Sequence, residues 1–155
     1  MKRLIALCVV LGVASVAPLY AQISDNTWLA YEVLTEDYDA LVKEAMNLSA
    51  EQWKAFEPVF EEYKAAMHPV FDRQINLIKA YADKEGKLTD DEAELVLVTM
   101  AEIERDEWLT LRDFEKSCLE VLPAAKVLRF LQIENRMRLV LMSKIALDVP
   151  LAKPE

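Results

Sequence analysis

Glycine is almost absent from this sequence. Only two of the 155 residues are glycine, and only Gly86 lies outside the apolar N-terminal stretch. Tight turns between β-strands and the loops that cradle nucleotide phosphates both depend on glycine, so a β-rich fold, a doubly wound sheet and a nucleotide site are disfavoured. Because 54% of the residues are hydrophobic, the chain is also a poor candidate for disorder. These absences predict an all-α fold.

Histidine is equally scarce. His68 is the only one, and the serine and cysteine candidates for a nucleophile lie far from it along the chain, with no recognisable oxyanion loop. We therefore predict that the protein is not an enzyme, that it has no catalytic residue and no cofactor, and that His68 is a solvated side chain.

Carboxylate pairs at helical spacing are the main alternative source of chemistry. Glu57 with Glu61, and Glu102 with Asp106, stand four residues apart. Such pairs could bind a divalent cation or act as an acid and a base. No polar pocket is predicted around them, so we interpret both pairs as solvated helix faces and predict no metal ligand.

Cysteine leaves two possibilities open. Cys118 is the only thiol beyond the N-terminal stretch, and it stands at an apolar position in step with Leu111 and Phe114. In an oxidising compartment an unpaired cysteine is either buried or forms an intermolecular disulfide. Because Cys118 lies on the same helix face as these apolar residues, burial is favoured.

The first 21 residues have the layout of a secretory signal peptide. Two basic residues precede an apolar run over residues 4–16, and Ala21 is the best cleavage point. We expect residues 22–155 to be exported as a single all-helical domain. An uncleaved membrane anchor is the alternative, because the apolar stretch continues to Tyr20.

Acidic residues outnumber basic ones. Residues 22–155 carry 27 acids against 16 bases, whereas residues 121–155 carry six bases against three acids. An acidic surface repels nucleic acid and anionic lipid headgroups, so neither is predicted as a partner. We expect the basic end to pack against acidic helices of its own chain or of a second subunit.

A long amphipathic helix over residues 50–85 organises the chain. Its apolar positions repeat every seven residues, which is typical of a coiled-coil seam. The stripe comprises Trp53, Phe56, Phe60, Tyr63, Met67, Val70, Leu77 and Tyr81, with Gln74 in the one polar slot. A helix of this length spans about 50 Å, so an elongated molecule is predicted.

Two prolines stand inside this helix. Pro58 and Pro69 lie about 20° apart around the helix and opposite the apolar stripe. Each removes an amide hydrogen bond and opens the helix on its own side. The two bends add, so we expect a bent helix whose stripe is concave and keeps its phase past both prolines.

Three further helices are predicted. The first is capped at residues 24–26 and ends near Asn47, with Tyr31, Leu34, Tyr38, Leu41 and Ala45 as its apolar positions. The third runs from the Thr89 cap to about Val121, after Gly86 has closed the long helix. The fourth begins with Pro123 in its first turn and ends at Val149 and Pro150. The remainder is expected to be a loose tail.

The starts of the second and third helices share a capping box. In each, a hydroxyl accepts the amide of the residue three positions on, whose side chain reaches back, and a leucine precedes the cap. The residues are Leu48, Ser49 and Gln52 in one start, and Leu88, Thr89 and Glu92 in the other.

This pattern resembles the LTxxQ motif of the Spy/CpxP family of periplasmic proteins, with Ser49 in the threonine position. The resemblance covers most of the chain in general character, as a glycine-poor, all-helical, exported protein with a long bent helix after the motif. Residues 56–63 and 122–151 resemble a less characterised branch of the same superfamily. A third segment keeps only its leucine, since Pro123 and Lys126 replace threonine and glutamine. The acidic charge also departs from the basic concave surface of the best-known family chaperone.

The resemblance implies a periplasmic, elongated four-helix protein with a bent second helix, acting as a curved antiparallel dimer in envelope stress. It would be an ATP-independent chaperone-like binding protein or a signalling adaptor, with unfolded or envelope proteins as partners. Two alternatives stay open: a metal-binding or metal-resistance protein, and a structural partner of an envelope complex.

The aromatic stripe supplies the candidate client-binding surface. If the long helix bends toward its stripe, part of the stripe forms a shallow cradle rimmed by Glu57, Glu61 and Asp72, which would attract basic unfolded segments. The candidate client-binding residues are Trp53, Phe56, Phe60, Tyr63, Met67 and Val70. A single layer of long helices would leave an apolar face uncovered, so we also predict a homodimer.

Overall fold

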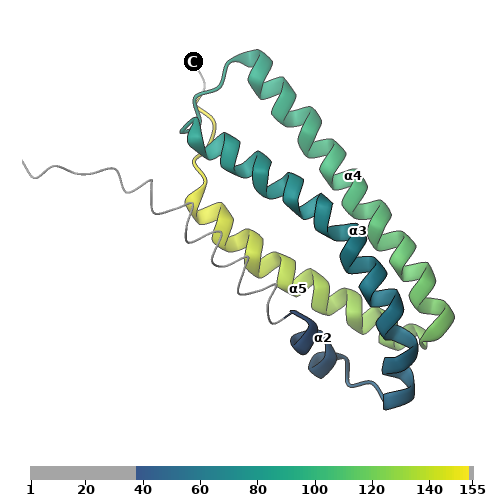
Figure 1. The fold of residues 1–155 in the computed structure, drawn as a ribbon. Coiled ribbons are helices and arrows are strands. Elements are labelled where there is room, and N and C mark those ends of the chain that lie inside the picture. The colour runs from purple at the N-terminus through teal and green to yellow at the C-terminus, as the bar shows by residue number, and fades with distance from the viewer. Residues whose placement is uncertain (1–37, 154–155) are drawn as a thin grey trace, which may run out of the picture.

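The computed structural model describes residues 38–153, and this part of the chain is helical with no β-strand. Its four helices are α2 (Tyr38–Met46), α3 (Ala50–Asp83), α4 (Asp90–Val121) and α5 (Ala124–Asp148). In Figure 1 the three long helices lie side by side in an elongated bundle, and the short α2 lies beside the first half of α5. The all-α prediction with four helices is confirmed. None of the described helices is long and apolar enough to span a membrane.

The long helix begins as predicted. Ser49 Oγ accepts the Gln52 amide at 3.2 Å, and Gln52 Oε1 accepts the Ser49 amide at 3.1 Å. Both Pro58 and Pro69 lie inside α3, and Figure 1 shows the helix changing direction along its length. Interior proline weakens the local hydrogen bonding, which is where helices bend. The long, proline-containing, bent helix is therefore confirmed.

The apolar stripe of α3 still faces the main core beyond Pro69, where Val70 is buried and Leu77 packs on the core. The buried residue that follows Val70 is Ile75, which stands off the predicted stripe, whereas Leu77 is only half-buried. Ile75 packs with Leu141 of α5, and Leu77 packs against the main core. The second half of α3 therefore buries one residue, Ile75, that the predicted stripe did not include, because α5 also covers that side of the helix.

The remaining helix ends follow the sequence signals closely. Thr89 Oγ1 accepts the Glu92 amide at 3.3 Å, and Glu92 Oε2 accepts the Thr89 amide at 3.0 Å, so α4 starts with a second capping box. Pro123 occupies the N-cap of α5, one position before its predicted place in the first turn. At the other end Val149 is the C-cap and Pro150 follows it.

Residues 151–153 are not a loose tail. The Lys153 amide donates to the Gly86 carbonyl at 2.9 Å, so residues 151–153 lie against the α3–α4 turn. Gly86 has φ +75°, and a Cβ there would lie 2.5 Å from the Leu151 carbonyl oxygen. Glycine is therefore required both by its backbone angle and by this close approach.

Aromatic rings form the core where α3, α4 and α5 meet. Phe114 of α4 lies 4.4 Å from Tyr63 and 4.6 Å from Phe130 of α5, measured between ring centroids. Phe56 and Phe60 of α3 also pack on Phe130, at 5.8 and 5.9 Å. Buried aromatic side chains contribute large apolar areas, so this cluster supplies much of the stability of the bundle.

The basic residues of α5 meet partners within their own chain. Lys126 Nζ donates to the carbonyls of Met46 and Asn47 at 3.3 and 2.7 Å, and Arg129 Nε donates to the Ala45 carbonyl at 2.5 Å. These contacts satisfy the last carbonyls of α2 and complement the negative end of its dipole. They fix α2 against α5.

Two predicted features lie outside the described residues. One is the beginning of α2, with Tyr31 and Leu34, and the other is the signal segment.

Candidate functional site: a groove between α3 and α5

A groove of about 770 Å³ opens between α3 and α5, with α2 at one end. Its size matches that of ligand-binding clefts, which occur often between the helices of bundles. The lining is mixed: the floor is apolar except for one buried carboxylate, and the edge is charged. It comprises Tyr38, Asp39, Glu61, Tyr63, Lys64, Ala65, Met67, His68, Phe71, Glu134, Met137, Arg138 and Leu141.

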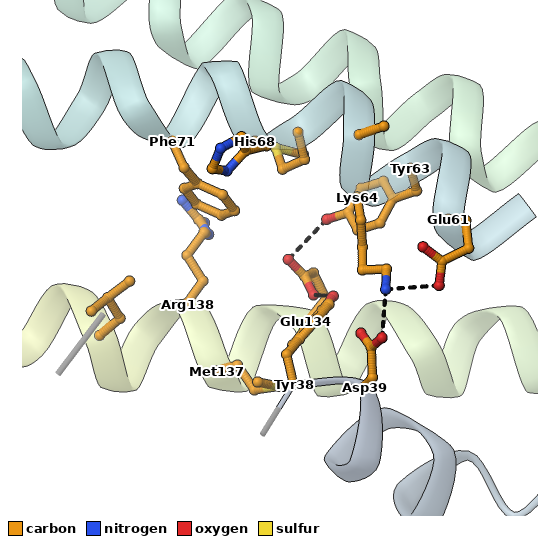
Figure 2. A pocket seen from close by; sticks show the side chains of 13 residues that line it. Tyr38, Asp39, Glu61, Tyr63, Lys64, His68, Phe71, Glu134, Met137 and Arg138 are labelled. Atoms are coloured by element: carbon orange, nitrogen blue, oxygen red, sulfur yellow. Dashed lines mark hydrogen bonds and ion pairs between the residues drawn. The ribbon is translucent and has the colours of Figure 1, made fainter. Parts of the chain in front are cut away.

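A buried carboxylate lies at one end of the floor. Glu134 accepts a hydrogen bond from Tyr38 Oη at 2.5 Å and another from Tyr63 Oη at 2.8 Å. Figure 2 shows the three side chains converging from α2, α3 and α5. Burial, and then the negative charge of Glu134, raise the pKa of both tyrosines far above its ordinary value. Both phenols therefore stay protonated and serve as donors to the carboxylate.

A second carboxylate lies behind the groove. Glu107 of α4 is 8% exposed and faces Arg138 Nη1 of α5 at 3.3 Å. Burial raises the pKa of Glu107, an effect that Arg138 opposes and that Glu134 and Glu104 reinforce. Arg138 also lines the groove, so its guanidinium contacts the buried Glu107 carboxylate on one side and the open groove on the other.

The rim of the groove carries paired charges. Lys64 Nζ lies 2.6 Å from Asp39 of α2 and 2.8 Å from Glu61 of α3, and Figure 2 shows it between the two carboxylates. Farther along α3, His68 Nε2 lies 3.5 Å from Asp72. Exposed pairs of this kind are weak and are screened by salt. The acids outnumber the bases, so the rim retains negative charge.

Most of the predicted client-binding residues are in the core instead. Within the single chain Phe56, Phe60, Tyr63, Met67 and Val70 are buried, and Trp53 is half-buried. The cradle expected along this stripe is filled by α4 and α5, because apolar faces of one chain pack on each other when the topology allows it. Only Tyr63 and Met67 also reach the groove wall.

The capping residues lie at helix ends and outside the groove. Ser49, Gln52, Thr89 and Glu92 hold the first turns of α3 and α4, as described above. Leu48 is half-buried against the core, beside the α2–α3 turn. The capping motif on which the Spy/CpxP resemblance rests therefore positions helices. It contributes no side chain to the groove.

The other residues considered from sequence are Cys118, His68 and the carboxylate pairs, and of these Glu61 and His68 line the groove. Cys118 is fully buried, and burial raises the pKa of its thiol to about 12. His68 is 68% exposed. Glu57 accepts a hydrogen bond from Trp53 Nε1 at 2.9 Å, and Asp106 pairs with Arg73 and Arg105. Among residues 38–153 no three acidic, histidine or cysteine side chains gather in a way that could hold a metal ion.

Sequence reasoning missed the half of the groove that α5 supplies. Glu134 stands between Phe130, Met137 and Leu141 at helical spacing, and a carboxylate in such an apolar row is the available signal of a buried polar site. The partners of Glu134 lie 71 and 96 residues away in the sequence, so no local pattern indicates them.

The fold and the groove define an all-α helical bundle with an open, mixed apolar and acidic cleft. Comparison with known proteins adds no relative: no protein-family model, no curated protein and no solved structure matches the chain. The Spy/CpxP resemblance therefore stays a prediction, based on the capping motifs and the character of the chain.

Proposed function

We propose that this chain is a non-enzymatic binding protein of the bacterial envelope, exported to the periplasm, that holds apolar segments of unfolded or envelope proteins without ATP. The groove between α3 and α5 is the observation that carries the proposal. It offers the apolar side chains of Met67, Phe71, Met137 and Leu141 within one cleft. Such a cleft would serve either a chaperone-like or an adaptor role, the two roles that the Spy/CpxP resemblance implies.

The chemistry of the groove favours binding over catalysis. Glu134 is held by two phenols whose raised pKa keeps them protonated, and Lys64 is held by two carboxylates. A general base or a nucleophile needs a group free to exchange a proton near neutral pH. Glu134 and Lys64 are both engaged by these partners, so the apolar floor is the main binding element.

The rim gives the expected preference among segments. Asp39 and Glu61 line the groove beside its apolar floor, and Asp72 lies next to the lining residue His68, so a segment that combines apolar side chains with lysine or arginine fits best. Rim charges act over about 8 to 10 Å at moderate ionic strength. Salt should therefore weaken binding of a basic segment without abolishing the apolar contribution.

The test is suppression of aggregation by the full chain, expressed with its own N-terminal residues. One reduced client should be basic, such as lysozyme, and one acidic, such as lactalbumin, each at low and high salt. We expect slower aggregation of the basic client at an equimolar ratio, a smaller effect at high salt, and no dependence on ATP. A variant with Ala65→Trp, which places an indole in the groove, should lose the effect.

Ala66→Trp is the matched control. Ala66 is exposed on the same helix but does not line the groove, so the same added bulk should leave aggregation unchanged from wild type. If wild type slows neither client under any condition, the chaperone-like role is contradicted. A pull-down from periplasmic extract that yields one stoichiometric partner, lost in Ala65→Trp and kept in Ala66→Trp, would instead support the adaptor role.

A further inference from the structure

The groove lies in line with the start of α2. Tyr38 and Asp39, the first two described residues of that helix, form one end of the groove, and Figure 2 shows them beside Glu134. The floor then continues along α3 and α5, away from α2, as far as Phe71 and Leu141. A helix that continued α2 toward its N-terminus would therefore enter the groove lengthwise.

The contacts between α2 and α5 set the register of such a helix. Arg129 donates to the Ala45 carbonyl, and five residues later Glu134 accepts from Tyr38 at the start of α2. Each step back along α2 thus corresponds to a step forward along α5, so the two helices run antiparallel.

The contacts between α2 and α3 have the same order. Lys43 Nζ lies 5.0 Å from the centroid of the Trp53 ring, and farther along α3 Lys64 pairs with Asp39 at 2.6 Å. The first residues of α2 therefore point along both walls of the groove at once.

The register brings apolar residues of the preceding segment to the groove. Seven further residues of helix advance about 10 Å along both walls. They bring Tyr31 level with Leu141 of α5 and close to Phe71 of α3, and they bring Leu34 level with Arg138. All three wall residues line the groove, and Phe71 is only half-buried.

Tyr31 and Leu34 would also lie on the inward face of the continued helix. That face of α2 carries Tyr38 and the buried Val42. Tyr31 stands about 20° and Leu34 about 40° from Tyr38 around the helix. The acidic residues of the segment stand at least about 100° from Tyr38, away from the groove and its acidic rim: Glu32, Glu36 and Asp37.

We propose that residues 27–37 continue α2 as a helix and occupy the groove of their own chain. The register and the inward pair of Tyr31 and Leu34 select this segment as the occupant. Its attachment to Tyr38 makes the binding intramolecular, which lowers the entropy cost that a separate partner bears. Where the groove holds clients, as proposed above, the segment competes with them and regulates the site. Only that competition rests on the proposed function.

Paired cysteines test the docking in the full chain. Tyr31→Cys with Leu141→Cys should form a disulfide on mild oxidation, detected by peptide mass mapping, because the docked helix places the two residues level and facing. Leu29→Cys with Leu141→Cys is the matched control, since Leu29 stands two residues from Tyr31 and about 200° around the helix. It should cross-link at least about tenfold more slowly. The pair Leu34→Cys and Met137→Cys repeats the test with Leu141 intact.

Equal cross-linking of the test and control pairs would overturn the docking. So would the absence of cross-linking in both test pairs, provided that circular dichroism shows the variants to be folded. Selective cross-linking of the test pairs supports it, because an unstructured tether would bring Leu29 and Tyr31 to Leu141 equally often.

Peptide binding separates this inference from the proposed function. A labelled, cysteine-free peptide of leucine and lysine should bind the oxidised Tyr31→Cys, Leu141→Cys chain at least about tenfold more weakly than the reduced chain, measured by fluorescence anisotropy. Equal binding by the two forms would contradict the competition. Selective cross-linking with no peptide binding by either form would support the docking and contradict the client role of the groove. Peptide binding with unselective cross-linking would do the reverse.

Discussion

Two carboxylates in the interior are stabilised by different partners. Glu134 accepts from two protonated phenols, and Glu107 faces the guanidinium of Arg138. Hydrogen bonds to a charged acceptor are stronger than those between neutral groups, and burial makes their loss costly. Glu134 therefore ties α2, α3 and α5 together, whereas Glu107 ties α4 to α5 and retains a raised pKa.

The raised pKa of Glu107 predicts a pH dependence of stability. In the folded chain Glu107 binds a proton more readily than in the unfolded chain, so its contribution is favourable below its ordinary pKa of 4.5 and is lost as the pH rises through the folded value. The substitution Glu107→Gln removes the carboxyl group whose ionisation causes this loss of stability. Urea unfolding from pH 4.5 to 8 should show the free energy of unfolding of the variant gaining on wild type as the pH rises.

Glu102→Gln provides the control for that experiment, because Glu102 is exposed on the same helix. Its difference from wild type should stay flat across the range. A Glu107→Gln variant whose difference from wild type is flat, or falls with pH, would show that burial does not disfavour the charged form of Glu107.

At the scale of helices, the sequence predicted most of what the structure shows. The two capping boxes, the interior prolines and the end of α4 at Val121 depend on residues within one or two turns of each other. Local hydrogen bonding and backbone geometry decide these features, so a pattern of neighbours is enough. The burial of Ile75 was not predicted, because it depends on how α5 returns along α3.

The cap of α3 predicts a measurable loss. Ser49→Ala removes the acceptor of the Gln52 amide and should lower the free energy of unfolding by about 1 kcal/mol. Ser143→Ala is the control, since Ser143 is exposed inside α5, where alanine is the better helix former. Thermal or urea unfolding should show Ser143→Ala as neutral or slightly stabilised. Equal stability of Ser49→Ala and wild type would show that this cap contributes nothing.

At the scale of the molecule, sequence reasoning could not decide which apolar face is covered. Phe56 and Phe60 were predicted to line a binding surface, yet α4 and α5 bury them completely. The groove and the capping of α2 by Lys126 and Arg129 depend on contacts across tens of residues. Such contacts follow from how the helices return on one another, which the periodicity of a single helix does not specify.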